Sequence, residues 1–324
     1  MIVSPALADA NNGNWRTARR WARMLREAYR VRLADRWDGG DEALMIALHA
    51  RRSALSVARF RARHPRGALV VALTGTDLYG DLSDAAIGAS LEAADRLVVL
   101  NRLGAAALPE PLRARTRVLL QSCAAQRALP KATRHLRALM VGHLREEKSP
   151  RTYFEAARRL ADRADIRLDH AGAALDATLG EEAARLARDC PRYRWLGALP
   201  HAQARRRIQA AHLLVHPSRL EGGAHVVIEA LRSGTPVLAS RIDGNVGLLD
   251  ADYDGYFEPG DAAGLAARLR QLRDAPAMLD HLAAQCAARA AAFEPARERA
   301  ALLALVRESL AAGRRPSSNL AGSA

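Results

Sequence analysis

Cysteine and aromatic side chains are both scarce in this sequence. Phe, Trp and Tyr together make up 4% of the 324 residues, and no basic stripe with interleaved aromatic residues, as nucleic-acid-binding surfaces often have, is present. The three cysteines, Cys123, Cys190 and Cys286, are far apart and form no C-x-x-C pair, which argues against a disulfide framework or a zinc site. We therefore expect a reducing, cytoplasmic setting.

Long apolar runs are absent as well. No stretch of about 18 consecutive apolar residues occurs, so we expect no membrane span. The apolar start at Met1–Val3 soon gives way to Pro5 and to the polar residues Asn11–Asn14, which is unlike a signal peptide. The sequence therefore predicts no stable membrane association.

Positive charge is abundant instead. The chain carries 49 Lys and Arg residues against 35 Asp and Glu residues, a formal net charge of +14. A basic surface attracts phosphates of any kind, whether in nucleic acid, in acidic lipids or in small anionic substrates. The arginines are dispersed, with the densest runs at Arg205–Arg207 and Arg314–Arg315, and this favours solvated helix faces over a nucleic-acid patch. We therefore expect small anionic partners and no nucleic acid.

Strand and helix patterns alternate along the chain and restart once. In the first half, expected strands at 1–6, 45–49, 68–73, 96–100 and 117–121 alternate with expected helices at 15–29, 53–63 and 83–94. In the second half, strands are expected at 137–141, 166–171, 193–196, 213–215, 236–239 and 255–257, and the helices between and after them at 150–162, 180–189, 201–211, 225–234, 262–272, 276–292 and 295–312. This alternation predicts an α/β fold with two doubly wound, Rossmann-like domains.

The same pattern indicates the domain boundaries. We expect an N-terminal domain at 1–125 and a C-terminal domain at 136–292, with Pro130 and Lys131 in the linker between them. A helix at 293–312 follows. The tail at 313–324 is rich in Ser, Gly and Arg and is expected to be disordered.

Glu221 and Glu229 are the most informative residues of the chain. They flank a Gly-Gly turn and the start of a helix, after the strand Leu213–Val215. The free N–H groups at the helix start, near Gly222–His225, can hold a diphosphate. Glu221 can accept hydrogen bonds from sugar hydroxyls, whereas Glu229 lies roughly 8–9 Å further along the helix axis, where a ribose would lie. Either glutamate taken alone would more often be an ordinary surface residue, and only the whole motif around them favours a site.

The whole stretch resembles the E-x7-E motif of retaining glycosyltransferases with the GT-B fold, family 4 in particular. The shared letters are Pro217-Ser218, Glu221-Gly222, Glu229-Ala230, Gly234, Pro236-Val237 and Ala239-Ser240. The resemblance implies two Rossmann-like domains that face a central cleft, a last helix that crosses back to the first domain, and a UDP-sugar donor. It implies a catalytic role for Glu221 and donor-binding roles for Glu229, Ser218, Gly222, Gly223 and Ala224. Gly244 and Asn245, after the next strand, match the family's glycine loop in part and are expected to contact the donor through their backbone.

A second motif lies at Val141–Lys148, where a strand leads into a helix. Gly142, Leu144 and Lys148 match the family pattern G-R-L…K-G, whereas His143 replaces the usual Arg and Ser149 the usual Gly. A cation in such a loop can neutralise a diphosphate. The resemblance implies that Lys148 binds the leaving-group phosphate, that Gly142 and His143 line the donor site, and that Arg145 substitutes for the missing arginine. No Asp-x-Asp follows a strand of the first half, so neither a metal ion nor another cofactor is implied.

Two loops of the first half are expected to bind the acceptor. One contains Asn12, Gly13, Asn14 and Arg16 and opens the first helix, although an Asn-rich turn with a helix cap explains it equally well. The other contains Thr76 and Asp77 at the end of a strand, where doubly wound sheets bind ligands. Asp77 could orient a substrate or act as a base, or it could cap the local turn.

The first half also resembles one subgroup of these enzymes, the selenosugar synthases of selenoneine biosynthesis. The similar stretches are Ser4-Pro5, 12–18, 48–53, 73–79, 94–100 and Gln121-Ser122. Such enzymes join N-acetylglucosamine or glucose from a UDP-sugar to selenophosphate and form a carbon–selenium bond. A conventional family 4 transferase acting on a cell-surface glycan or lipid is the alternative, with Trp15, Trp21 and Arg16–Arg26 as a membrane-docking face. A nucleic-acid-binding protein is suggested by charge alone.

Overall fold

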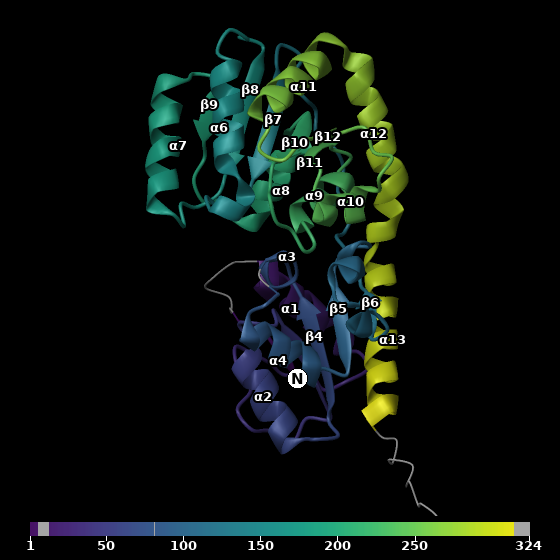
Figure 1. Cartoon of the computed structure of the whole chain (residues 1–324). Coiled ribbons are helices and arrows are strands. Elements are labelled where there is room, and N and C mark those ends of the chain that lie inside the picture. Colours follow the sequence, from purple (N-terminus) through teal and green to yellow (C-terminus); the bar gives the residue numbers. More distant parts are fainter. Residues whose placement is uncertain (6–12, 81, 314–324) are drawn as a thin grey trace, which may run out of the picture. The chain divides into compact units, whose positions relative to one another are not determined.

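The computed structural model describes residues 1–5, 13–80 and 82–313. Asn12 of the expected acceptor loop and residues 314–324 of the expected disordered tail lie outside these ranges. The chain forms two compact units (Figure 1). The first contains Met1–Leu100, Gly104–Leu119 and the chain from Glu298 onward, and the second contains Asn101–Leu103 and Leu120–Arg297.

The first unit is built on a six-stranded sheet in which all neighbouring strands are parallel. In spatial order, its strands are β2 (Leu33–Ala34), β1 (Ile2–Val3), β3 (Leu44–Leu48), β4 (Ala68–Leu73), β5 (Arg96–Val99) and β6 (Thr116–Val118). Its helices are α1 (Gly13–Leu25), α2 (Ala54–Arg63), α3 (Thr76–Tyr79), α4 (Ala85–Ala93), η2 (Gly104–Ala107), α5 (Glu110–Arg113) and, from Glu298 onward, α13 (Pro295–Gly313). The strand order reverses between β1 and β3, which makes their carboxyl ends the topological switch point of this sheet.

Helix α13 completes the core on one face of the first sheet. Its residues Leu302, Leu305 and Val306 are buried with Trp21 of α1 and with apolar side chains of β3, β4 and β5. The Trp21 indole donates a hydrogen bond of 2.7 Å to Oε1 of Glu298. Because Trp21 is 0% exposed, it cannot serve in the membrane-docking face that the conventional alternative requires.

The second unit is built on another six-stranded parallel sheet. In spatial order, its strands are β12 (Tyr256–Phe257), β11 (Val237–Ser240), β10 (Leu213–His216), β7 (Leu136–Val141), β8 (Ile166–Ala171) and β9 (Tyr193–Trp195). Its helices are η3 (Glu146–Lys148), α6 (Pro150–Arg159), α7 (Ala177–Asp189), α8 (His201–Ala210), α9 (His225–Leu231), α10 (Asp243–Leu249), α11 (Ala262–Asp274), α12 (Pro276–Ala290) and η4 (Ala291–Phe293). This order matches that of dinucleotide-binding folds, with the switch point between β7 and β10.

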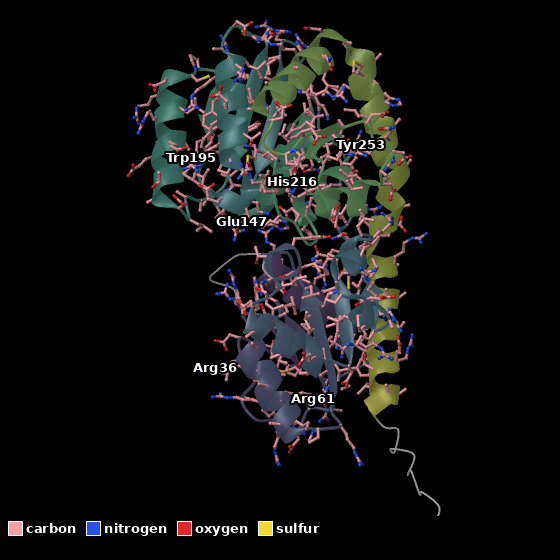
Figure 2. The ribbon with its side chains drawn as sticks, in the orientation of Figure 1. Arg36, Arg61, Glu147, Trp195, His216 and Tyr253 are labelled. Atoms are coloured by element: carbon pink, nitrogen blue, oxygen red, sulfur yellow. The ribbon has the colours of Figure 1, made fainter. Side chains whose placement is uncertain are left out.

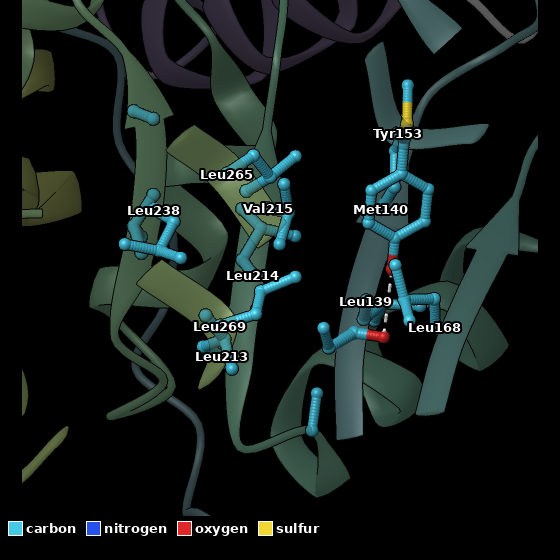
Figure 3. Packing of buried hydrophobic residues seen from close by; sticks show 14 of the residues in the cluster. Leu139, Met140, Tyr153, Leu168, Leu213, Leu214, Val215, Leu238, Leu265 and Leu269 are labelled. Carbon is cyan, nitrogen blue, oxygen red and sulfur yellow. Dashed lines mark hydrogen bonds between the residues drawn. The ribbon is translucent and has the colours of Figure 1, made fainter. Parts of the chain in front are cut away.

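Continuous apolar runs form the central strands because helices cover both faces of a parallel sheet. In the second unit, Leu139 and Met140 of β7, Leu168 of β8 and Leu214 of β10 are all buried (Figure 3). Tyr153 of α6 lies among them, and its hydroxyl donates to the carbonyl oxygens of Ala138 and Asp169 at 3.1 and 3.2 Å. The fully buried Tyr153 hydroxyl is therefore hydrogen-bonded, as a buried polar group must be.

The structure differs from the sequence prediction in several local features. The residues expected as a linker, 126–135, lie in the second unit, where the Gln126 and Leu129 N–H groups donate to the carbonyls of Arg232 and Gln209. The short edge strand β2 was not predicted, because two residues are too few to show the apolar pattern of a strand. Asp243–Gly247 was expected as a loop and instead begins helix α10.

Candidate active site

The fold brings two loops of the second unit together. Strands β7 and β10 are direct neighbours in the sheet, with Ala138 opposite Leu213. Their carboxyl ends therefore meet at the switch point, where ligands bind in open α/β sheets. The loop after β7 carries Gly142–Ser149, and the loop after β10 carries Pro217–Ala224. The two motifs singled out in the sequence thus form one site.

Glu221 is the centre of this site. Its Oε1 pairs with the Lys148 ammonium, accepts a hydrogen bond of 2.8 Å from the Ser218 hydroxyl, and lies 3.1 Å from Nε2 of His216. The residue is only 8% exposed. Burial alone would raise the pKa of Glu221, but Lys148 and His216 outweigh this effect and hold that pKa well below its usual range. Glu221 is therefore an ionised carboxylate at neutral pH.

His216 was not predicted as a site residue. It is the last residue of β10, it is buried, and it lies in the interior of the second unit (Figure 2). Its Nε2 lies near Glu221 but is not aligned for a hydrogen bond. Among the residues that the structure describes, this nitrogen has no hydrogen-bond partner. The available signal was its position directly before Pro217-Ser218 in the quoted motif.

Glu229 forms a second ionised centre on helix α9. Nε2 of His201 donates a hydrogen bond to Oε1, and Nδ1 of His225 lies 3.3 Å from the same oxygen. Burial alone would raise the pKa of Glu229, but the contacts with His201 and His225 hold that pKa well below its usual range. His201 was not predicted, because it begins α8 and only the fold brings it to Glu229.

The Gly-Gly turn between these centres is held by a residue from far earlier in the chain. The Asn101 side chain donates a hydrogen bond of 2.8 Å to the carbonyl oxygen of Gly222, and Leu103 N–H donates to its Oδ1 at 2.9 Å. A Cβ on Gly247 would lie 2.2 Å from that Oδ1, so this approach requires glycine there. Ala224 N-caps α9, and its carbonyl accepts from Val227 N–H at 2.8 Å.

The helix α9 ends as the sequence predicts. Gly234 has φ = 66°, a conformation that favours glycine. Thr235 N–H donates back to the carbonyl of Ala230 at 3.0 Å and so satisfies one of the free carbonyls at the helix end.

Gly244 and Asn245 have packing roles in the structure. A Cβ on Gly244 would lie 1.9 Å from the carbonyl oxygen of Glu221, so α10 presses directly on the backbone of the site. The backbone N–H of Asn245 donates to the carbonyl of Ile242, and its side-chain amide donates to the carbonyl of Ser240, both at 2.9 Å. The Asn245 N–H is thus hydrogen-bonded inside the helix, and the expected contact of backbone groups at Gly244 and Asn245 with a donor stays a prediction.

Hydrogen bonds to β8 and to the residues that follow it hold the loop after β7 in place. Nε2 of the buried His170 donates to the carbonyl of Gly142 at 3.0 Å, and Nδ1 of His143 accepts from Ala173 N–H at 3.0 Å. Ser149, which replaces the family's glycine, has φ = 49°. Arg145 pairs with Glu147 at 3.0 Å, and the structure does not bring it to Glu221.

A family model described as "Glycosyl transferases group 1" matches residues 124–291, more than half of the chain. The chain belongs to this family. The matched region contains the Lys148–Glu221 site and Glu229. The predicted α/β fold of GT-B type, with two Rossmann-like domains, is confirmed, and so is the predicted glycosyltransferase class.

Among curated proteins, the chain is similar to D-inositol 3-phosphate glycosyltransferase 1 of Catenulispora acidiphila, with 36% identity over 116 residues, which is 36% of this chain and 28% of that protein. It is also similar to the glycogen synthase of Mycobacterium tuberculosis, with 36% identity over 99 residues, 30% of this chain and 23% of that protein. The aligned segments thus span only about a quarter of these relatives.

Solved structures share the fold across most of the chain. Sucrose-phosphate synthase from Thermosynechococcus elongatus has a TM-score of 0.69 at 21% identity and covers 83% of this chain and 74% of its own. Anabaena HepE, solved with UDP-glucose, has a TM-score of 0.67 at 15% identity, with 82% and 79% covered. The pneumococcal O-GlcNAc transferase GtfA, solved with UDP and GlcNAc, has a TM-score of 0.63 at 16% identity, with 82% and 57% covered.

The residues that the sequence predicts to bind the acceptor lie in the first unit. Gly13 begins α1, its carbonyl accepts from the Thr17 hydroxyl at 2.9 Å, and Asn14 and Arg16 follow it partly exposed. Thr76 is exposed at the start of α3, whereas Asp77 is 0% exposed.

Of the roles left open for Asp77, the structure shows turn capping. Its Oδ1 accepts from the N–H groups of Thr74 and Gly75 at 2.8 and 2.9 Å, and its Oδ2 accepts from Ala50 N–H at 2.8 Å. These three backbone hydrogen bonds occupy both carboxylate oxygens, and direct binding of the acceptor by Asp77 stays a prediction.

The described residues contain neither a metal-binding cluster nor a helix that could span a membrane. In residues 1–5, 13–80 and 82–313, no group of three or more His, Cys, Asp or Glu side chains is arranged to hold a metal ion. In the same residues, no helix is long and apolar enough to cross a membrane. Independence from metal and a cytoplasmic setting stay predictions.

Proposed function

We propose that this glycosyltransferase transfers N-acetylglucosamine or glucose from a UDP-sugar to selenophosphate and so forms a selenosugar for selenoneine biosynthesis. The C1–O bond of the donor breaks and its electron pair leaves on UDP, while a selenium lone pair forms the C1–Se bond. The observation that carries the donor half is the pair of ionised glutamates, each buried and each held by cationic or hydrogen-bonding partners, on one strand–loop–helix segment.

The donor is assigned to the second unit by chemistry. Lys148 supplies a fixed positive charge for the departing diphosphate, and Glu221 accepts hydrogen bonds from sugar hydroxyls. Glu229 lies on the helix that follows, in reach of ribose hydroxyls. Lys148 pairs with Glu221, and we assign the same ammonium to the diphosphate of the donor. Structures of HepE with UDP-glucose and of GtfA with UDP and GlcNAc, which share the fold, support a UDP-sugar.

The acceptor rests on the resemblance of the first half to selenosugar synthases and on the net charge of +14, which suits a second anionic substrate. The burial of Trp21 removes one aromatic anchor from the membrane-docking alternative. Glycan or lipid acceptors therefore rank second and nucleic-acid binding third.

The test is UDP release by the full chain, measured with UDP-GlcNAc and UDP-glucose in parallel. The acceptor arms are selenophosphate, inorganic phosphate, D-inositol 3-phosphate and a glycan mixture, with binding to anionic liposomes and to DNA as separate arms. We expect turnover with selenophosphate well above the arm without acceptor. Turnover with a glycan or with D-inositol 3-phosphate, and none with selenophosphate, would reject the selenium assignment and keep the family chemistry.

A further inference from the structure

The first unit contains a buried histidine at a position that the site described above does not use. His49 directly follows β3, and Thr76 lies two residues beyond Thr74, which follows β4. Strands β3 and β4 are neighbours, so both residues lie at the same edge of the sheet. His49 also lies at the β1–β3 switch point, where an open α/β sheet binds its ligand.

The backbone of His49 is in an unusual conformation. Its φ is 69°, a left-handed value that few residues other than glycine adopt, and the side chain is 7% exposed. The surrounding hydrogen bonds hold it there: His49 N–H donates to the carbonyl of Ala72 at 2.8 Å, and Ser53 N–H donates to the carbonyl of His49 at 3.0 Å. Strained residues of this kind cluster at ligand sites, because the rest of the fold must hold them in place.

The hydrogen bonds around the imidazole define its direction. Nδ1 lies 3.7 Å from Oδ2 of Asp77, beyond hydrogen-bond distance, whereas Arg52 N–H approaches the same nitrogen at 3.5 Å. On this basis we assign Nδ1 as the acceptor and place the proton on Nε2. Burial lowers the pKa of His49, partly offset by Asp77, so the ring is neutral at neutral pH.

Thr76 is the exposed residue of the His49–Thr76 hydrogen-bonded pair. Nε2 of His49 lies 3.2 Å from the Thr76 hydroxyl oxygen and, as the protonated nitrogen, donates to it. A hydroxyl whose oxygen already accepts a hydrogen bond is a stronger donor through its own proton. Asp77 fixes the turn that carries Thr76 through its three backbone contacts.

We propose that His49 and Thr76, on a turn that Asp77 fixes through backbone hydrogen bonds, form a relay that presents the Thr76 hydroxyl as a hydrogen-bond donor to an anionic oxygen of a small, phosphate-like acceptor. Thr76 contacts the acceptor, and His49 is a positioning residue that acts through Thr76. This assignment rests on the proposed function only in taking the acceptor to be a small anion. It adds His49 to the acceptor side and gives His49 and Thr76 different roles.

The experiment measures binding of inorganic phosphate to the full chain by phosphorus NMR line broadening, with UDP binding measured by calorimetry on the same samples. The variants are Thr76→Val, which removes the hydroxyl at constant shape, Thr76→Ser, which keeps it, and His49→Asn, which tolerates a positive φ but does not reach Thr76. We expect Thr76→Val and His49→Asn each to weaken phosphate binding about tenfold or more, as loss of one hydrogen bond to a charged group does. Thr76→Ser should stay within about twofold of the parent, and UDP affinity should be the same in all variants.

Three results would overturn the relay: no phosphate binding by the parent chain, equal phosphate binding by Thr76→Val and the parent, or an equal loss of UDP affinity. A merely structural role for His49 predicts a lower melting temperature in His49→Asn with phosphate affinity unchanged. If His49→Asn does not fold, the Thr76 pair decides alone. Because the readout is phosphate binding and not turnover, a failure of UDP release with selenophosphate rejects the proposed function separately.

Discussion

Replacement of Lys148 with Ala should impair the chemical step more than donor binding. Negative charge grows on the departing diphosphate as the sugar–oxygen bond breaks, so a fixed ammonium contributes more in the transition state than in the ground state. Loss of such a group typically costs about 2.7–4 kcal/mol, so kcat should fall roughly 100- to 1000-fold while the donor KM changes little.

The structure adds a cost in stability to the same substitution. The side chains of Lys148 and Glu221 are 19% and 9% exposed, so the variant would leave an ionised carboxylate buried with only Ser218 and His216 beside it. Removal of one partner of a buried ion pair costs about 3–5 kcal/mol, and the partial exposure of Lys148 places the expected loss near the lower end, about 3 kcal/mol. The pKa of Glu221 should rise, because Lys148 is the main group that lowers it.

These two effects are separated by a second variant and a control. Lys148→Met with Glu221→Gln removes both charges and should recover most of the melting temperature, yet kcat should stay low. Arg151→Ala removes a cation whose pairs with Glu146 and Glu182 lie at the surface, so its kcat and stability should match the parent within about 0.5 kcal/mol. UDP release at saturating donor gives kcat. A normal kcat in folded Lys148→Ala would refute the leaving-group role.

Three further outcomes are expected. Glu229→Ala should raise the donor KM more than it lowers kcat, because it removes a charged hydrogen bond to ribose that contributes about 1.5–3 kcal/mol to donor binding. Unchanged donor affinity in calorimetry would contradict the ribose assignment. The pKa of Glu229 lies below its ordinary value of 4.5, so the stability that its carboxylate contributes should be full at neutral pH and should be lost as pH falls below 4.5. Thermal melts of Glu229→Gln over the same pH range should show a shallower slope than the parent. Turnover should survive EDTA, and loss that magnesium or manganese restores would show that the reaction needs a metal ion.

The structure of the segment that carries Glu221 and Glu229 could be predicted from the sequence because its parts are local. One segment of strand, loop and helix, from Leu213 to Gly234, carries both glutamates, and a glycine with positive φ ends it. Within one such segment, the number of residues between two side chains determines how far apart they lie along the helix or strand. His201 and Asn101 could not be found in this way, because they come from another helix and from the end of a first-half strand. Only the completed sheet brings them to Glu229 and Gly222.

Lysine usage is a signal in the sequence that points to the same site. Lys131 and Lys148 are the only lysines among 49 Lys and Arg residues. The two cations differ in shape and hydration, so an arginine would not supply the same compact positive charge as Lys148. Lys148 pairs with the buried Glu221, which is consistent with a need for a compact ammonium at this position.

Glycines were harder to interpret than charges. Gly244 and Gly247 follow a strand, and this favoured a ligand-binding loop, but both lie in α10. Their missing side chains allow the helix to approach the Glu221 carbonyl and the Asn101 amide closely. A glycine that admits a ligand and a glycine that admits another backbone have the same sequence pattern, because both require only the absence of a Cβ.

The acceptor half was the least predictable for a related physical reason. An aspartate after a parallel strand can bind a substrate or cap the turn, and burial decides between these roles. Asp77 is buried and its two oxygens accept three backbone N–H groups, so the side chain that meets solvent is the neighbouring Thr76. The residue that orients Thr76 is His49, whose positive φ has no signature in the sequence. Acceptor recognition by this pair then depends on the backbone conformation of His49, which the surrounding fold holds. Substitutions that leave His49 and Thr76 in place but loosen this backbone should therefore alter acceptor affinity before they alter donor affinity.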